Sequence, residues 1–133
     1  MSTPTTDYLL LFRGNEWQKR LSPEELEKSL SSFMGWFEKL NAEGKMKGSN
    51  PLNPEGKLVS GSKGRVVVDG PFAESKEAIG GYFLISVADE AEAIAIAQLC
   101  PILEHGSVVE VRPVAQECPV ATGLRRAAEL AHA

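Results

Sequence analysis

The chain has 133 residues, of which 43% are hydrophobic and 24% charged, and these values predict one globular domain with an ordinary hydrophobic core. A formal net charge of −4 argues against nucleic-acid binding, which usually needs a basic surface. No apolar run approaches the roughly 20 residues that span a bilayer. The short polar start shows no signal-peptide pattern, so we expect no membrane partner and a cytoplasmic location.

The two cysteines, Cys100 and Cys118, stand far apart and belong to no CxxC motif. No histidines cluster near them, so their pattern argues against a zinc site. We therefore expect free thiols in a reducing compartment, and neither a metal nor another cofactor.

The first predicted elements are a strand and a loop. Residues 1–7 are polar and are expected to be disordered. The apolar run 8–13 is short enough to be a buried strand. The loop 14–20 contains Trp17, whose ring either packs in the core or an interface, which is the commoner case, or forms the wall of a pocket.

A long helix is predicted next. Ser22 and Glu25 have the spacing of a capping box, and Pro23 occupies a first-turn position where its missing N–H costs nothing. Gly44 is a suitable left-handed terminator. One helical face is apolar and is expected to pack in the core: Leu26, Leu30, Phe33, Phe37 and Leu40.

The middle of the chain is rich in short strands. Residues 45–52 are ambiguous, whereas 57–60 and 65–69 have the pattern of a hairpin. Residues 82–87 alternate in a further strand whose two faces are both largely apolar. Helices on one side of a sheet cover only one of these faces, so another surface must cover the second.

The last part predicts a helix, a strand and a tail. Asp89 is a suitable cap for a helix that Pro101 ends. Residues 108–112 alternate as the final strand. We expect His105, just before that strand, to be a solvated loop residue. Residues 115–133 form a tail with a possible short helix, which either docks or frays.

The order strand, helix, strand, strand, helix, strand predicts an α+β, ferredoxin-like fold over residues 8–114, with an antiparallel sheet and helices on one face. The hairpin either inserts between the second and third strands or extends the sheet. The apolar open face predicts a face-to-face homodimer.

A family resemblance supports this fold. The segment 69–77, Asp-Gly-Pro-Phe-Ala-Glu-Ser-Lys-Glu, followed by Gly-Gly-Tyr at 80–82, resembles the signature of the DGPF-domain proteins, a branch of the YCII-related family. Segments 89–93 and 110–114 also match, and the resemblance spans roughly residues 7–114. It implies a dimeric α/β barrel-type fold in a small bacterial protein of mostly undefined function. Some members lie beside genes for extracytoplasmic-function sigma factors, which implies a link to transcription regulation.

The resemblance carries over only part of a catalytic site. Some YCII relatives are thought to transfer protons on small acids with a His–Asp pair, but the only histidines here are His105 and His132, outside the first half where relatives place theirs. Of the His–Asp pair, only the acidic residue has a counterpart in this sequence, which is Asp69. It is either a general acid or base next to Phe72, or an acceptor that fixes its own turn.

The candidate site is built around Asp69 as the catalytic residue. Arg13 could pair with Asp69, hold the carboxylate of an anionic ligand, or be a surface charge. The expected ligand-binding residues are Arg13, Gly70, Pro71, Phe72, Glu74 and Tyr82. Two function classes follow: a dimeric module that binds a small anionic ligand or a protein partner, slightly favoured by the missing histidine, or a small-molecule lyase or isomerase.

Overall fold

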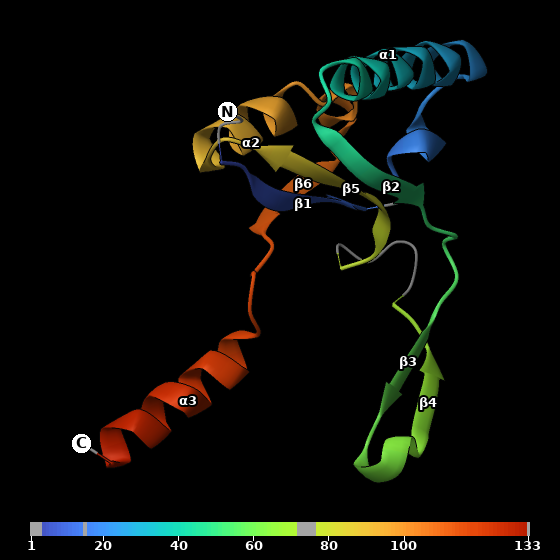
Figure 1. Ribbon diagram of the computed structural model, residues 1–133. Helices are drawn as coiled ribbons and strands as arrows, with labels where there is room; N and C mark the ends of the chain where they lie inside the picture. Colours follow the sequence, from blue (N-terminus) through green and yellow to red (C-terminus); the bar gives the residue numbers. More distant parts are fainter. Residues whose placement is uncertain (1–3, 15, 72–76, 133) are drawn as a thin grey trace.

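The computed structural model describes residues 4–14, 16–71 and 77–132 (Figure 1). The strands are β1 (Thr6–Arg13), β2 (Met46–Pro51), β3 (Lys57–Ser60), β4 (Val66–Asp69), β5 (Ile79–Val87) and β6 (Val108–Pro113). The α-helices are α1 (Pro23–Ala42), α2 (Glu90–Gln98) and α3 (Pro119–Ala131). Three short 3-10 helices are η1 (Trp17–Arg20), η2 (Ser62–Gly64) and η3 (Pro101–His105).

The main sheet has four antiparallel strands in the order β2-β5-β1-β6. Helices α1 and α2 both lie on one face of this sheet (Figure 1). The apolar strand β1 occupies a central position, where both of its edges are hydrogen-bonded. The predicted α+β architecture with helices on one face is therefore confirmed, and the strand order is that of a ferredoxin-like fold.

The core lies between the sheet and these two helices. Leu10 of β1 and Ile85 of β5 are fully buried. The ring of Phe12 makes edge-to-face contacts with Phe33 and Phe83, at centroid distances of 5.5 and 4.9 Å. It contacts Trp36 in the same way at 6.1 Å. Such aromatic pairs add to the free energy gained by burying their area.

Helix α1 has the predicted ends. Ser22 Oγ accepts a hydrogen bond from the Glu25 amide at 3.1 Å, and Glu25 Oε1 accepts one from the Ser22 amide at 3.0 Å. Gly44, just beyond the helix, has a φ of 73°, a left-handed conformation that costs glycine little.

The predicted apolar face of α1 is confirmed for Phe33, Phe37 and Leu40, which pack in or against the core, but not for Leu30. Trp36 is only 7% exposed, whereas Leu30 is 49% exposed. Ser29, Trp36 and Leu40 are the buried residues of the helix, and they share one line along its surface. The large indole of Trp36 fills the space above the sheet, and this turns the Leu30 side of the helix towards the edge of the core.

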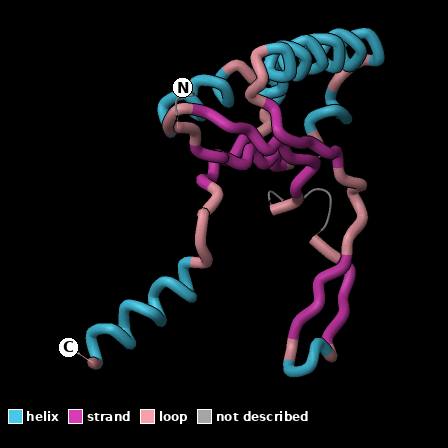
Figure 2. Tube along the Cα trace, viewed as in Figure 1, coloured by secondary structure: helices cyan, strands magenta, loops and turns pink. Residues whose placement is uncertain are grey.

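The β3–β4 hairpin is confirmed, but it does not extend the main sheet. It forms a separate two-stranded sheet, inserted between β2 and β5, that projects from the domain (Figure 2). All eight residues of its two strands are exposed. Its exposed apolar side chains are Leu58, Val59, Val66, Val67 and Val68.

Helix α3 also projects from the domain, as Figures 1 and 2 show. The possible helix of the tail is thus present, but it does not pack against the domain within the described residues. Its apolar residues Val120, Leu124 and Leu130 are all exposed. Both α3 and the hairpin extend on the side of the sheet that α1 and α2 leave uncovered (Figure 1).

The capping box generates a test of the fold. The change Ser22→Ala should lower the free energy of unfolding by about 1 kcal/mol, because the backbone amide of Glu25 loses its acceptor, the Ser22 hydroxyl. Urea denaturation measures this change. Ser32→Ala, an exposed position within the same helix, is the matched control and should not destabilise, since alanine is the better helix former. Equal losses in both variants would contradict a capping role.

Candidate functional site

The structure places Asp69 at the end of β4, on the projecting hairpin. Its side chain is 73% exposed and forms an ion pair with Lys57 Nζ from the opposite strand position. The amide of the next residue, Gly70, donates to the Gly56 carbonyl oxygen at 3.0 Å. Pro71 is half-buried. Phe72 and Glu74 lie outside the described residues.

Arg13 does not meet Asp69 in this chain. Its guanidinium binds Glu110 of the neighbouring strand β6, with Nε and Oε1 2.6 Å apart. Arg112 binds the other oxygen of the same carboxylate at 3.2 Å. The sequence alone did not indicate Glu110, because its role depends on the register of β1 against β6.

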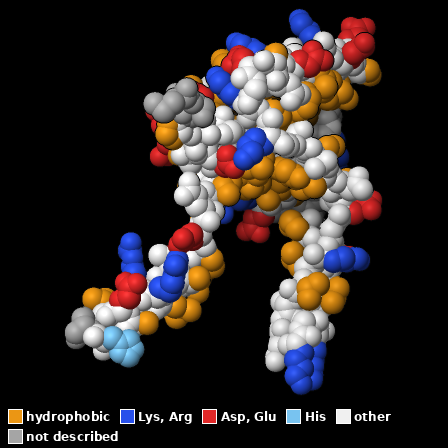
Figure 3. All heavy atoms as spheres, viewed as in Figure 1, with side chains coloured by type: hydrophobic (Ala, Val, Ile, Leu, Met, Phe, Trp, Pro, Cys, Tyr) orange, Lys and Arg blue, Asp and Glu red, His pale blue; other side chains and the backbone are white. Residues whose placement is uncertain are grey.

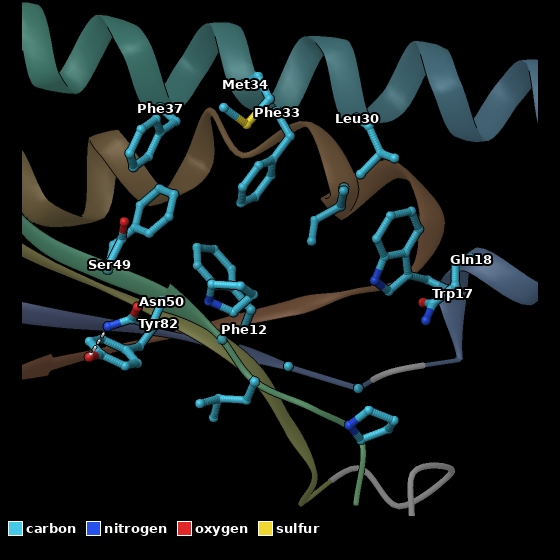
Figure 4. Close-up of a pocket in the computed structure, with 18 of the residues that line it drawn as sticks. Phe12, Trp17, Gln18, Leu30, Phe33, Met34, Phe37, Ser49, Asn50 and Tyr82 are labelled. Carbon is cyan, nitrogen blue, oxygen red and sulfur yellow. Dashed lines mark hydrogen bonds between the residues drawn. The ribbon is translucent and has the colours of Figure 1, made fainter.

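A pocket of about 660 Å³ lies between α1, the main sheet and η1. Figure 4 shows Leu30, Phe33 and Phe37 pointing from α1 towards the sheet, with Trp17 at one end of the space. The pocket walls are mainly aromatic or apolar: Phe12, Trp17, Leu30, Phe33, Met34, Phe37, Leu52, Phe83 and Ile102. Among the sequence-predicted site residues that are described, Tyr82 lines this pocket.

The pocket lies beside the buried line of α1. Leu30 and Met34, both about half exposed, lie at the edge of the core instead of inside it. The loop after β1 then returns as η1 and brings Trp17 beside them. Trp17 packs partly against the core and also lines the pocket, so both alternatives considered for its ring apply.

His105 supports the same region, and its expected role as a solvated loop residue is wrong. Its Nε2 lies 2.8 Å from the Ser29 hydroxyl oxygen, and its ring stacks on Trp17 at a centroid distance of 6.0 Å. Its backbone oxygen accepts a hydrogen bond from Arg20. Because η3 returns towards α1, His105 connects the buried side of that helix to the end of the pocket.

Few polar groups line the pocket. Asn50 Nδ2 donates a hydrogen bond of 2.8 Å to the Tyr82 hydroxyl (Figure 4). Glu16 Oε2 pairs with Lys19 Nζ at 3.1 Å. The second oxygen, Glu16 Oε1, is buried and has no hydrogen-bond partner among the described residues. A few polar groups within apolar walls are typical of sites for small organic ligands.

The thiols lie outside this pocket. Both are free, and burial raises the pKa of Cys100 to about 11. Hydrogen bonds from the Ala121 and Val120 amides lower the pKa of the exposed Cys118 thiol.

Across residues 4–14, 16–71 and 77–132 there is no group of three side chains that could together bind a metal ion. Within the same ranges, no helix has the length and apolar character to cross a bilayer.

The chain was compared with models of known protein families and with curated proteins. The family model of the YCII-related domain matches residues 7–117. No curated protein matches the chain.

The exposed ion pair of Asp69 gives a prediction. Asp69→Asn should change the free energy of unfolding by less than about 1 kcal/mol, because solvent screens an exposed pair and the turn retains its backbone hydrogen bond. Urea denaturation of both proteins tests this expectation. A loss above roughly 2 kcal/mol would instead show that the carboxylate fixes the turn.

Proposed function

The chain belongs to the YCII-related family, and from this premise we propose that it binds a small, largely apolar organic molecule in the pocket beneath α1. The observation that carries this proposal is the cavity of about 660 Å³ with aromatic walls. Ligand pockets typically measure roughly 300–1,000 Å³ and combine apolar walls with a few polar groups.

The energetics also favour a ligand. The pocket exposes Leu30 and Met34 to solvent instead of closing them into the core. A molecule that removes apolar surface from water gains about 25 cal/mol for each Å². Burial of 200 Å² in the pocket would thus contribute on the order of 5 kcal/mol before the entropy cost of association.

We also propose that the protein is a homodimer in which the open sheet face meets the same face of a second copy. Leu9, Leu11 and Leu84 lie on this face and are half-buried. Figure 3 shows hydrophobic side chains gathered beneath the sheet and along the projecting segments. Apolar surface of this extent favours a protein partner over water.

The charges around the open face support a second copy as that partner. Arg13, Glu110 and Arg112 form an ionic cluster at one side, and Lys47 pairs with Asp7 at 2.8 Å towards the other. An apolar centre with charged margins is typical of protein interfaces. In a two-fold dimer, each copy would also present its hairpin and α3 to the other.

Further proposals concern the family branch, the ligand near Asp69, the genetic setting and the cellular location. The Asp-Gly-Pro-Phe sequence supports placement in the DGPF branch, and an anionic ligand near Asp69, a sigma-factor-linked setting and a cytoplasmic location stay predictions. Proton transfer by Asp69 is the second candidate function. It would need the hairpin to bring this exposed carboxylate to a ligand, and the opposite copy of a dimer is one surface that the hairpin could reach.

The pocket can be tested with the fluorescent probe N-phenyl-1-naphthylamine. Its fluorescence should rise on binding, and Leu30→Trp should weaken its affinity by about tenfold or more, because a larger side chain fills the pocket. Leu103→Trp, an exposed leucine outside the lining, is the matched control. Unchanged affinity in Leu30→Trp, or no binding to the wild-type protein, would refute the proposed site.

Light scattering tests the dimer. The wild-type protein should have twice the chain mass of 14.4 kDa at micromolar concentration. Leu84→Lys should shift it to the monomer mass, because a desolvated ammonium at the centre of the interface is costly. Leu103→Lys should remain dimeric. A wild-type mass of one chain would contradict the proposal.

A further inference from the structure

We propose that, in the dimer, helix α3 of each copy packs across the β3–β4 hairpin of the other copy. This inference rests on the proposed homodimer and names surfaces that hold the two copies together. The features behind it are the two projecting arms of the molecule, the hairpin and α3, whose apolar faces have no cover among the described residues.

One face of the hairpin is mainly apolar. The strands pair in a register that places Leu58 opposite Val68 and Ser60 opposite Val66. Residues opposite each other, and residues two apart in a strand, point to the same face. Leu58, Val66 and Val68 are each about half exposed. A hairpin of two strands is at best marginally stable in water, so its apolar face needs a further layer, such as a helix.

Helix α3 has the length and the apolar face to be that layer. Its 13 residues span about 20 Å, whereas the four-residue strands of the hairpin span about 14 Å. Spacings of four, three and four residues place Val120, Leu124, Ala127 and Ala131 along one stripe of the helix. Val120 and Leu124 are 71% and 67% exposed. A helix of this length is marginal in isolation, so it also needs a partner.

The positions of the arms make a second copy the partner that fits. The hairpin connects β2 to β5 and α3 follows β6, so the arms start from opposite sides of the sheet. Both extend on its uncovered face (Figures 1 and 2). A copy whose open face lies on this sheet is therefore placed between the arms. Each arm runs from its own sheet towards the other copy, so paired arms lie with the tip of one beside the base of the other.

Two-fold symmetry leaves two ways to pair the arms, and charge favours one of them. If like arms met, hairpin would face hairpin, and residues 57–69 carry three Lys or Arg and one Asp, a net charge of +2 that repels its copy. If unlike arms meet, the hairpin tip with Lys63 and Arg65 lies beside the start of α3 and Glu117. Glu117 binds Arg125 in its own copy, and a carboxylate has room for a second cation.

Cross-linking tests this pairing, because Cys118 at the start of α3 is exposed and free, whereas Cys100 is buried. The change Ser60→Cys adds a thiol near the hairpin tip, on the apolar face. With the flexible reagent bismaleimidohexane, this variant should give a covalent product of two chains on a denaturing gel. The wild-type protein tests contact between two α3 helices, and the double variant Ser60→Cys, Cys118→Ser tests contact between two hairpins. Both controls should remain single chains.

A two-chain product in either control, or a bridge within one chain of the Ser60→Cys variant, would overturn the inference. The lack of any two-chain product from Ser60→Cys would do the same if the wild-type protein has the mass of a dimer in solution. A wild-type mass of one chain would reject the dimer itself.

Substitution on the α3 stripe provides a second readout. Leu124→Gln should raise the dissociation constant of the dimer about tenfold or more, because apolar contact with the partner's hairpin is lost. Sedimentation equilibrium measures this constant. Glu129→Gln, at an exposed position of the same helix outside the stripe, is the matched control and should leave the constant unchanged. Equal constants for Leu124→Gln and the wild type would show that α3 does not pack on the other copy.

Discussion

The packing of Phe12 against the aromatic residues of α1 is the contact on which the rest of the structure depends. Its ring lies within 6.1 Å of those of Phe33, Trp36 and Phe83, which joins β1, α1 and β5 at one point. Because Trp36 occupies the buried line of the helix, α1 cannot also bury Leu30 and Met34. The same contact that closes the core therefore opens the pocket beside it.

Helices α1 and α2 cover only one face of the main sheet (Figure 1). Strand β5 is apolar on both faces, but α1 and α2 lie on the same side (Figure 1). The hairpin and α3 carry exposed apolar side chains, and on the other face Leu9, Leu11 and Leu84 are half-buried among the described residues. The proposed dimer would resolve all three exposures with one two-fold contact. The pocket lies beneath α1, but Tyr82 belongs to its lining and also alternates with Leu84 on the open face, so the two surfaces adjoin at this residue.

The sequence predicted only part of the candidate site. The motif from Asp69 onwards is specific enough to indicate the family, yet it lies on and beyond an exposed hairpin, where Asp69 pairs with Lys57. Arg13 was a reasonable ligand anchor, but its partner Glu110 is far away in sequence and adjacent only through strand pairing. His105 showed no pattern beyond its position before a strand, although the fold uses it to join Ser29 and Trp17.

The features that the sequence alone could predict are those that depend on interactions between neighbouring residues. The capping box of Ser22 and Glu25, the left-handed turn at Gly44 and the alternation in β5 depend on neighbouring residues, so these elements were predictable. The element order then led to the strand order through short connections. Only tertiary structure decided which face of α1 is buried, how far the hairpin projects and where the aromatic pocket lies. These features depend on the shapes of side chains from distant segments, and the periodicity of a single segment carries no information about them.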